Sequence, residues 1–537
     1  MLKLSIATAF DLSTRGTILS DFAPRRKEVM LSKTKSLSLI GLNGILVTVE
    51  VDISGGDMPK FDIVGLPDAS VKESKERVRA AIKNSGLQFP NKVITVNLAP
   101  ADVKKEGGQL DLAIAVGILK CNDNSLVRFV AETVFLGELS LEGGIRSVHG
   151  VLPMVIAAKN AGIKRVVLPK ENEKEAALVS DIEILGVSSL KDVIEFLKGG
   201  EIVSAPHTEY FPNADKTCDD DLCYVKGQYV AKRAIEIAVS GGHNMLMVGA
   251  PGSGKTMIAK CIPSIIPDMT FEEAVETTAI HSVYGALDSA DGVVGKRPFV
   301  TPHHTATFVS LIGGGNTLKP GLISLAHNGV LYLDEMPEYS RQTLECLRQP
   351  LEDGVVTVSR AKGSVKYPAD FMLVASMNPC PCGNYGSEKG ECKCTDAQIR
   401  KYRSKISGPL LDRIDIQIQV DNVSYDDLTE KTKGESSAAV RKRVNRARAV
   451  QRERFSEDGI LTNSQMKEKH IAKYCVLSPE CEAIMKRSFD TLALSARARS
   501  RILKVARTIA DLDYSETIEK KHLLEAIGYR NFDFEKN

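Results

Sequence analysis

A single glycine-rich segment constrains this chain more than any other feature of its sequence. Residues 249–256 read GAPGSGKT; an apolar run, 245–248, precedes them, and an apolar-spaced helix is expected from Met257. Glycines let backbone N–H groups turn inward around phosphates, and a helix N-terminus adds a positive dipole. Lys255 can then reach the β- and γ-phosphates, and the Thr256 hydroxyl can ligate Mg²⁺. A chance glycine-rich turn is the alternative, but the flanking strand and helix favour a phosphate-binding loop (P-loop).

A second segment supplies the acidic groups that nucleotide hydrolysis needs. Residues 329–333 form a short apolar run, typical of a buried parallel strand, which ends in Asp334 and Glu335. Asp334 would hold Mg²⁺ through water, and Glu335 would polarise the attacking water. Two acids closing an ordinary edge strand are the alternative. Together the two segments predict an ATPase whose cofactors are ATP and Mg²⁺. The predicted nucleotide-binding residues are Gly249, Ala250, Pro251, Gly252, Ser253, Gly254, Lys255, Thr256 and Asp334.

Composition narrows the class of protein and its compartment. The chain has 537 residues, 43% hydrophobic and 26% charged, with a net charge of +2. Any nucleic-acid binding must therefore come from local basic patches. The sequence contains no apolar run of about 18 residues, so we expect no membrane partner. Its 11 cysteines are odd in number and follow no secretory signal, which favours a reducing cytoplasmic location.

Patterning along the chain predicts an α/β protein of several parts. Strands and helices alternate from Met30 to about residue 200, a polar linker follows, and the sequence beyond the P-loop region is strongly helical. The expected parts are a non-native or disordered extension (1–29), an α+β N-terminal domain (30–200), a linker (201–221), the ATPase core (222–423) and a helical C-terminal domain (424–537).

The N-terminal part resembles the C-terminal proteolytic domain of Lon. The match is best at residues 135–141 (FLGELSL) and 161–172 (AGIKRVVLPKEN). Lon proteases pair a serine nucleophile with a lysine base. This chain has Gln109 where the serine belongs, and residues 150–154 (GVLPM) contain no lysine. The resemblance therefore implies the fold without the catalytic dyad.

Four further blocks are specific enough to indicate a family. They are residues 231–238 (AKRAIEIA) with 241–244 (GGHN), 302–305 (PHHT) with 313–315 (GGG), 324–329 (SLAHNG) and 378–383 (NPCPCG). From Val225 to Leu512 the chain closely resembles the YifB/ComM group of magnesium-chelatase-like AAA+ ATPases. The wider family is named after the motor subunit of a chelatase that inserts magnesium into a porphyrin. ComM-like members instead resemble hexameric motors that migrate branched DNA, so the family name is a poor guide to substrate.

The resemblance also implies roles for residues outside the P-loop. Asn378 corresponds to the sensor-1 residue that orients the lytic water. Arg413 corresponds to an arginine finger that enters the neighbouring subunit's site, although an ion pair with Asp412 or Asp415 would also explain it. Arg497 corresponds to sensor 2 in the helical lid, with Arg499 close enough to leave the register open. A finger supplied by a neighbour implies a homo-oligomer, expected to be a hexameric ring.

A β-hairpin is predicted over residues 355–367, with its turn at 361–363. In related ring motors a hairpin at this place points into the central channel. Arg360, Lys362 and Lys366 would then put cations where a DNA backbone passes. A solvated hairpin tip is the alternative. His303 and His304 fit either a second insert or hydrogen-bonded structural positions.

Two close cysteine pairs suggest a metal site. Cys380, Cys382, Cys392 and Cys394 flank a polar loop, and four thiolates can hold a structural Zn²⁺. Free thiols are the alternative, because C-x-C pairs are tighter than the usual C-x₂-C.

The leading functional prediction is a DNA translocase or branch-migration helicase acting on branched or single-stranded DNA. A magnesium-chelatase motor subunit is the alternative, and an ATP-dependent protease is disfavoured by Gln109.

Overall fold

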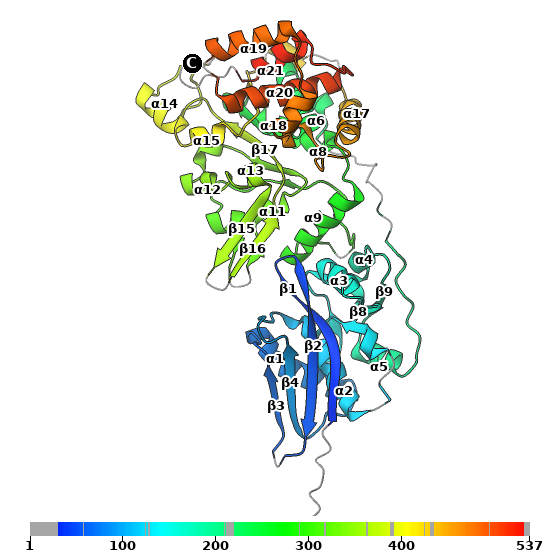
Figure 1. The fold of residues 1–537 in the computed structure, drawn as a ribbon. Coiled ribbons are helices and arrows are strands. Elements are labelled where there is room, and N and C mark those ends of the chain that lie inside the picture. The colour runs from blue at the N-terminus through cyan, green and yellow to red at the C-terminus, as the bar shows by residue number, and fades with distance from the viewer. Residues whose placement is uncertain are drawn as a thin grey trace, which may run out of the picture.

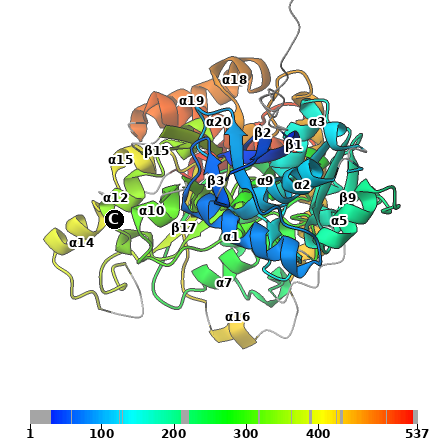
Figure 2. The same cartoon turned by 90° about the horizontal axis from the view of Figure 1, so that it is seen from below.

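The protein is built in three parts along one axis (Figure 1). The computed structural model describes residues 30–530 except 57, 124, 127–128, 209, 211–219, 289, 316–317, 361–362, 387–390, 424, 430–433 and 493. The expected extension over residues 1–29 therefore lies outside the described residues. The N-terminal domain forms one end of the molecule, the P-loop core the middle and the helical domain the other end. In the view from below, the N-terminal domain lies in front of the P-loop core (Figure 2).

A seven-stranded mixed sheet organises the N-terminal domain. In spatial order its strands are β3 (Lys60–Val64), β4 (Val93–Ala99), β2 (Asn43–Ser54), β1 (Met30–Ile40), β5 (Thr133–Phe135), β8 (Arg165–Pro169) and β9 (Glu183–Val187). β1, β2 and β4 are antiparallel neighbours, β3 pairs with β4 in parallel, and β5, β8 and β9 add further parallel strands beside β1. Alternating burial along β2 and β4 gives the sheet an apolar core face.

Five helices cover this sheet. They are α1 (Ala69–Asn84), α2 (Asp111–Asn122), α3 (Val151–Asn160), α4 (Glu173–Ala176) and α5 (Leu190–Leu197). α1 begins at Ala69 because Asp68 caps its start by accepting from the Val71 N–H. α2 is buried almost all round, so it is the central helix of the core. Gln109 lies in the turn before α2, where its amide donates to the Glu106 carbonyl at 2.6 Å.

The central domain is built on a five-stranded sheet in which all neighbouring strands are parallel. In spatial order its strands are β11 (Phe299–Val300), β14 (Val330–Leu333), β17 (Met372–Met377), β10 (Met245–Val248) and β18 (Ile416–Gln419). Every residue of β10, β14 and β17 is buried, as expected for short apolar strands covered on both faces. The predicted α/β core with a parallel sheet is thus confirmed.

Helices and two small hairpins surround the central sheet. The helices are α6 (Tyr229–Gly241), α7 (Lys255–Lys260), α8 (Ile262–Ile265), α9 (Phe271–Tyr284), α10 (Phe308–Ile312), α11 (Leu322–Leu325), α12 (Arg341–Glu345), α13 (Pro350–Asp353), α14 (Asp396–Arg403) and α15 (Gly408–Leu411). The hairpins are β12 (Gly313–Gly314) with β13 (Lys319–Pro320), and β15 (Val355–Arg360) with β16 (Gly363–Pro368). The helix expected from Met257 begins two residues earlier, at Lys255, and a new helix begins just before Pro263.

The C-terminal part is helical, as predicted. Its helices are α16 (Tyr425–Thr429), α17 (Ser437–Arg454), α18 (Glu468–Tyr474), α19 (Pro479–Thr491), α20 (Ala496–Leu512) and α21 (Lys520–Gly528). α17 and α20 both pack against α6, and the apolar residues of all three belong to one core with β10 and β18. Among the described residues, no helix combines the length and apolar character needed to cross a bilayer.

The N-terminal domain docks onto α9 of the central domain through a small polar cluster. The buried Glu175 carboxylate accepts hydrogen bonds from the Leu152 N–H at 2.8 Å and from the Ser282 hydroxyl of α9. The Gly150 N–H donates to the Ser282 hydroxyl oxygen at 2.9 Å. Leu152, Leu178 and Ala279 surround this cluster with apolar contacts. The two domains are therefore joined by a desolvated carboxylate whose partners come from both sides.

Removal of the Glu175 side chain should loosen this interface. Glu175→Ala leaves the Leu152 N–H and the Ser282 hydroxyl without their acceptor, which costs about 1–3 kcal/mol for each buried group. Glu175→Gln keeps an acceptor oxygen and should retain most of the stability. Thermal unfolding of the two variants measures the difference, and equal melting temperatures would contradict the assigned role.

The stability that Glu175 contributes should also depend on pH. Burial raises the pKa of Glu175 above its ordinary 4.5, although the hydrogen bonds from Ser282 and Leu152 oppose the shift. The folded state therefore holds this proton more tightly than the unfolded chain, and stability falls as pH rises from about 4.5 through the raised pKa. Glutamine does not ionise, so Glu175→Gln should gain stability relative to the native chain as pH increases.

Candidate active site

The predicted site lies at the carboxyl edge of the central sheet. β10 leads into residues 249–254, β14 into Asp334, and β17 into Asn378. These three strands are parallel neighbours, with Val248 beside Met377 and Leu333 beside Ala375. Ligands bind at this edge in open α/β sheets. The strand order thus brings together three segments that are far apart in the sequence.

The P-loop has the backbone that close approach to phosphates requires. Gly252 and Gly254 have φ of 78° and 91°, which is the left-handed region that glycine favours, and nothing lies within 4 Å of either Cβ position. At Gly249, by contrast, a Cβ would lie 2.3 Å from the Val420 carbonyl oxygen of the neighbouring segment. Gly249 therefore allows the Val420 segment to pack closely against the loop, whereas Gly252 and Gly254 leave the loop open toward a ligand.

Lys255 lies at the first position of α7 with its side chain turned onto the loop. Its ammonium donates to the carbonyls of Gly249 and Ala250 at 2.8 and 2.9 Å. It also donates to the Asn378 side-chain oxygen at 3.3 Å. Burial lowers the pKa of Lys255, while the negative charges of Asp334 and Glu335 oppose that shift. A single cation thus connects the P-loop with the end of β17.

Asp334 is the centre of a dense hydrogen-bond network. One carboxylate oxygen accepts from the Thr256 hydroxyl at 3.0 Å, and the other accepts from the Tyr332 hydroxyl at 2.9 Å and from Ser376. Burial opposes ionisation, but these hydrogen bonds outweigh it and lower the pKa of Asp334. The network therefore holds a charged carboxylate beside the Thr256 hydroxyl, as a divalent cation site requires.

Glu335 extends from the sheet edge in a strained backbone conformation. Its φ of 49° lies in the left-handed region, which a residue with a side chain adopts at a cost of about 1–3 kcal/mol. Its N–H donates to Asp334 and to the Ser376 hydroxyl oxygen, each at 3.2 Å, and its carbonyl accepts from Glu338 at 2.8 Å. These contacts hold the turn, and the Glu335 side chain is exposed at the mouth of the site.

Arg413 is placed away from the P-loop contacts, in a cluster of cations. Its guanidinium is largely buried, donates to the Pro409 carbonyl at 2.7 Å and pairs with Glu352. An ion pair of Arg413 with Asp412 or Asp415 is the alternative that the sequence allows, but in the structure Arg413 pairs with Glu352 of α13. Burial lowers the pKa of the Arg413 guanidinium, and further positive charges add to that effect. They belong to Arg348, Arg497 and Arg501.

The first turn of α20 separates the two sensor-2 candidates. Arg499 pairs with Glu482 of α19 at 3.5 Å. Arg497 is exposed, and its charge acts on Arg413. One helical turn later, Arg501 pairs with the buried Asp415 and donates to the Arg413 carbonyl at 3.1 Å. Arg497, rather than Arg499, therefore shares a region of the protein with the finger candidate.

The predicted hairpin forms β15 and β16, which are joined by residues 361–362. Arg360 and Lys366 are exposed on it, whereas Lys362 lies outside the described residues. Val358 and Val365 face the core, and the Arg360 guanidinium packs against Gly314 of the neighbouring hairpin.

The side chains of His303 and His304 are exposed with ring centroids 4.2 Å apart.

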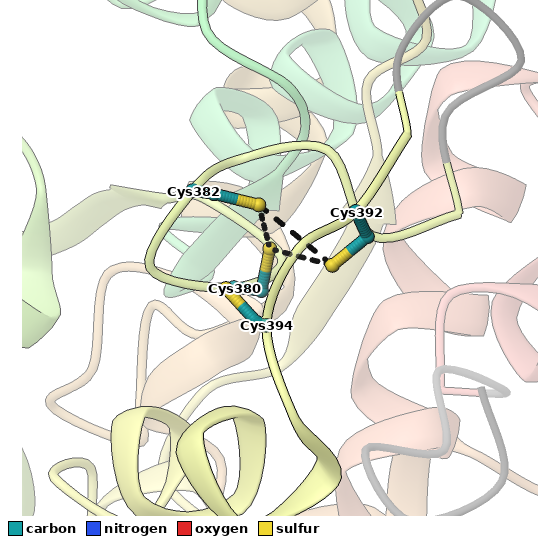
Figure 3. A group of neighbouring side chains, drawn as sticks. All are labelled: Cys380, Cys382, Cys392 and Cys394. Atoms are coloured by element: carbon teal, nitrogen blue, oxygen red, sulfur yellow. Dashed lines mark hydrogen bonds between the residues drawn. The ribbon is translucent and has the colours of Figure 1, made fainter.

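The structure also brings the four predicted cysteines together immediately after Asn378. Their sulfur atoms all lie within 4.8 Å of one another. The arrangement is drawn in Figure 3.

Several residues of the site had no role in the sequence-based prediction. Tyr332 and Ser376 are polar residues within apolar strands, and both bond to Asp334. Gln228 donates to the Ser253 carbonyl of the P-loop at 3.0 Å and to the Asp421 carbonyl at 2.6 Å. Gln228 directly follows Gly227, and Gly227 is one of the residues that line a cavity of about 440 Å³ beside α6. Tyr332 and Ser376 could have been found from the sequence, because each is a polar residue within an otherwise apolar strand.

These residues fit ATP and Mg²⁺. The open glycines and Lys255 can receive phosphate oxygens, and Thr256 with Asp334 provides a hydroxyl and a carboxylate for Mg²⁺. Glu335 and Asn378 border the same edge of the sheet. The arrangement can support attack of water on a terminal phosphate.

Comparison with known proteins gives matches along most of the chain. Residues 221–428 match the family described as magnesium chelatase, subunit ChlI; residues 49–172 match subunit ChlI of Mg-chelatase; and residues 434–530 match the C-terminal part of that subunit. The chain is 42% identical to the competence protein ComM of Haemophilus influenzae, over 92% of this chain and 96% of that protein. It is 41% identical to the uncharacterized protein YifB of Escherichia coli, over 94% of this chain and 97% of that protein. It is also 28% identical to Lon protease 2 of Bacillus subtilis, over 34% of this chain and 35% of that protein.

Two substitutions separate nucleotide binding from hydrolysis. Glu335→Gln should bind ATP normally but hydrolyse it about 10²–10⁴-fold more slowly, because the carboxylate that is expected to accept a proton from water is lost. Lys255→Ala should instead weaken ATP binding itself. Equilibrium binding of a fluorescent ATP analogue and steady-state phosphate release measure the two effects. Turnover of Glu335→Gln at the native rate would show that Glu335 is not the base.

Arg413 can be tested by mixing two defective chains. Arg413→Ala should bind ATP yet hydrolyse it about 10³–10⁵-fold more slowly, as expected for a lost arginine finger. Mixing it with Lys255→Ala should recover activity, since one chain retains the P-loop and the other the finger. Phosphate release at a series of mixing ratios measures the recovery.

Glu352→Gln is the matched control for Arg413. It breaks the ion pair within the chain but keeps the guanidinium, so hydrolysis should continue. Equal losses in Glu352→Gln and Arg413→Ala would indicate that the pair is only structural. Absence of recovery in mixed rings that are shown to form would argue against action across an interface.

Proposed function

Because the chain belongs to the YifB/ComM family of magnesium-chelatase-like AAA+ ATPases, we propose that it is an ATP-hydrolysing ring motor that moves DNA. The observation that carries the ATPase part is the contact between Thr256 and Asp334 at 3.0 Å, made where β10 and β14 both end. It joins the phosphate-binding loop to the acidic strand end in one site. The DNA part rests on the cationic hairpin and on the similarity to a competence protein.

The residues of the site divide the hydrolytic step among them. The P-loop N–H groups and Lys255 hold the phosphates, and Mg²⁺ held by Thr256 and Asp334 would neutralise charge on the β- and γ-phosphates. Glu335 takes a proton from the attacking water through a carboxylate oxygen, while the water oxygen bonds to the γ-phosphorus and ADP leaves with the bridging oxygen. Asn378, which already bonds to Lys255, orients that water. The Asp334 network keeps these groups in place without participating in proton transfer.

The position of Arg413 supports assembly into a ring. In the described structure its guanidinium bonds to Pro409 and Glu352 and to no P-loop residue. The cations of Arg348 and Arg497 lie near it. Arg497 is exposed, and Arg413 would meet the phosphates of a neighbouring subunit's nucleotide by exchanging Glu352 for them. We therefore propose a homo-oligomer whose sites form between subunits, with a hexamer as the expected number.

The two adjacent hairpins provide the DNA contact in this proposal. The buried faces of β15 and β16 fix the hairpin to the core, so its exposed cations stand on a rigid support. Gly314 has no side chain, which leaves space for the Arg360 guanidinium between the hairpins. Positive charges presented in this way bind a phosphate backbone without reading its sequence.

The alternatives predict other partners. A chelatase motor is supported by the family that residues 221–428 match, and it would respond to a porphyrin-binding subunit. A protease would need a nucleophile where the chain has Gln109, whose amide donates to Glu106. An amide cannot perform that reaction.

The hairpin variant tests the DNA proposal. Arg360→Ala with Lys366→Ala should weaken binding to all DNA sequences equally and lower the salt slope of log affinity by about one unit per lost phosphate contact. Basal ATPase activity should remain, because neither residue contacts the P-loop. DNA binding by fluorescence anisotropy across a salt series measures the slope.

The matched control removes two exposed cations elsewhere. Lys520→Ala with Lys521→Ala changes the net charge equally but lies on α21 in the helical domain. It should leave the salt slope unchanged. Native affinity and strand movement in the hairpin variant would exclude the hairpin from DNA binding.

A further inference from the structure

The four-cysteine cluster, consisting of Cys380, Cys382, Cys392 and Cys394, is separate from the nucleotide contacts. Cys380 and Cys382 follow Asn378, and the other two precede α14. Figure 3 shows the four cysteine side chains close together. The Cys380 sulfur lies 3.4 Å from that of Cys382 and 3.7 Å from that of Cys392, and the Cys382 and Cys392 sulfurs are 3.7 Å apart. Four sulfur atoms from two segments therefore surround one point.

The sulfur spacing matches a tetrahedral metal centre. With a Zn–S bond of about 2.3 Å, tetrahedral geometry places the sulfurs about 3.8 Å apart. A disulfide would bring two sulfurs to about 2.05 Å, and these cysteines are free. An iron–sulfur cluster holds several irons between its cysteines, so it would separate the sulfurs further than the 4.8 Å within which all four lie. The spacing fits a single ion.

The backbone around Cys382 also has the form of a metal knuckle. Gly383 adopts a φ of 83°, and its N–H donates to the Cys380 carbonyl at 3.0 Å. The N–H groups of Asn384 and Lys393 donate to the Cys382 sulfur. Such donors stabilise the negative charge that thiolate ligands carry. A tight C-x-C pair can thus direct both of its sulfurs to one side.

We propose that this cluster binds one structural Zn²⁺, and that the ion holds the Asn378 segment against the P-loop. Zinc is favoured over harder divalent ions because thiolates are soft ligands. The metal site does not depend on the proposed motor function, because metal content can be measured without ATP or DNA. The cysteines are positioning residues in this account, because they act on nucleotide chemistry only through Asn378 and the P-loop.

The first link between cluster and active site is direct packing. Asn378 accepts from Lys255 at 3.3 Å and lies two residues before Cys380. Between the first two ligands and the second pair, Gly383 lies against the P-loop: a Cβ at Gly383 would be 2.4 Å from Pro251 Cδ. Movement of the cysteine loop would therefore disturb the P-loop and its lysine contact together.

The second link runs through α14. This helix begins just after Cys394, with Thr395 as its cap. From its last residue, the Arg403 guanidinium donates to the Pro379 carbonyl at 3.2 Å. The Tyr402 hydroxyl accepts a hydrogen bond from the Asn378 N–H. An ion that joins both ends of the loop would fix α14 and Asn378 in one geometry, whereas free thiols would leave the ends unconnected.

Metal content is the first test. Protein purified in reductant and without chelator should contain one zinc per chain by elemental analysis. A mercurial titration should release that zinc as four thiols react. Cobalt substitution should give the visible absorption of a tetrahedral tetrathiolate site. Absence of zinc, with no cobalt spectrum on addition of Co²⁺, would overturn the metal site.

Variants test the positioning role. Cys382→Ser and Cys394→Ser should each lose zinc and lower the rate of ATP hydrolysis at least tenfold. Cys346→Ser is the matched control: this half-buried cysteine lies outside the cluster, donates to the Thr343 carbonyl at 2.9 Å, and its replacement should retain both zinc and activity.

A conservative variant guards against simple misfolding. Cys394→His offers a Cys₃His ligand set, which also holds structural zinc. It should recover zinc and most of the hydrolysis that Cys394→Ser loses. Native hydrolysis in a folded, zinc-free Cys394→Ser protein would overturn the link to Asn378. Recovery of zinc in Cys394→His without recovery of hydrolysis would also contradict that link.

Discussion

The carboxylate of Asp334 is the group on which the active site depends. It directly follows β14, and it accepts hydrogen bonds from the Thr256 hydroxyl of α7 and from Ser376 of β17. These contacts hold the ends of β10, β14 and β17 together. Burying even part of a carboxylate is costly unless it is hydrogen-bonded, and at the half-buried Asp334 the donors outweigh the cost and lower its pKa. The neighbouring Glu335 can then adopt its strained backbone, because the Asp334 and Ser376 side chains accept from its N–H.

A fully buried carboxylate, Asp415, performs the corresponding task at the opposite end of the central sheet. Asp415 accepts from the Asn244 N–H at 2.9 Å and pairs with Arg501 of α20, and Asn244 in turn bonds to the Leu373 N–H at 2.8 Å and to the Arg413 carbonyl at 3.0 Å. The helical domain is therefore attached to the sheet through the segment that carries Arg413. A change in the sheet can reach Arg413 and α20 through this connection, in addition to the core that α17 and α20 share with α6.

Much of the ATPase site could be predicted because its signals are local. The P-loop, the acids after β14 and the hairpin over residues 355–368 each occupy a short stretch whose pattern reflects its own backbone. The partner of Arg413 could not be predicted, since Glu352 lies 61 residues away and only the tertiary fold brings them together. The docking of Glu175 onto Ser282 has the same cause. α7 begins earlier than apolar spacing predicts because the P-loop ends at Gly254, whose φ of 91° is not helical, and Lys255 is the first helical residue.

The central claim is that ATP hydrolysis at this site moves DNA, and the most direct measurement compares activators of the native ATPase. Phosphate release should be measured with branched DNA, single-stranded DNA, a porphyrin and an unfolded protein, each at low salt, together with strand displacement on the branched substrate. We expect DNA alone to stimulate hydrolysis, and the branched substrate to be displaced only with ATP. Stimulation by the porphyrin or by unfolded protein, with no DNA affinity in assembled rings, would contradict the claim.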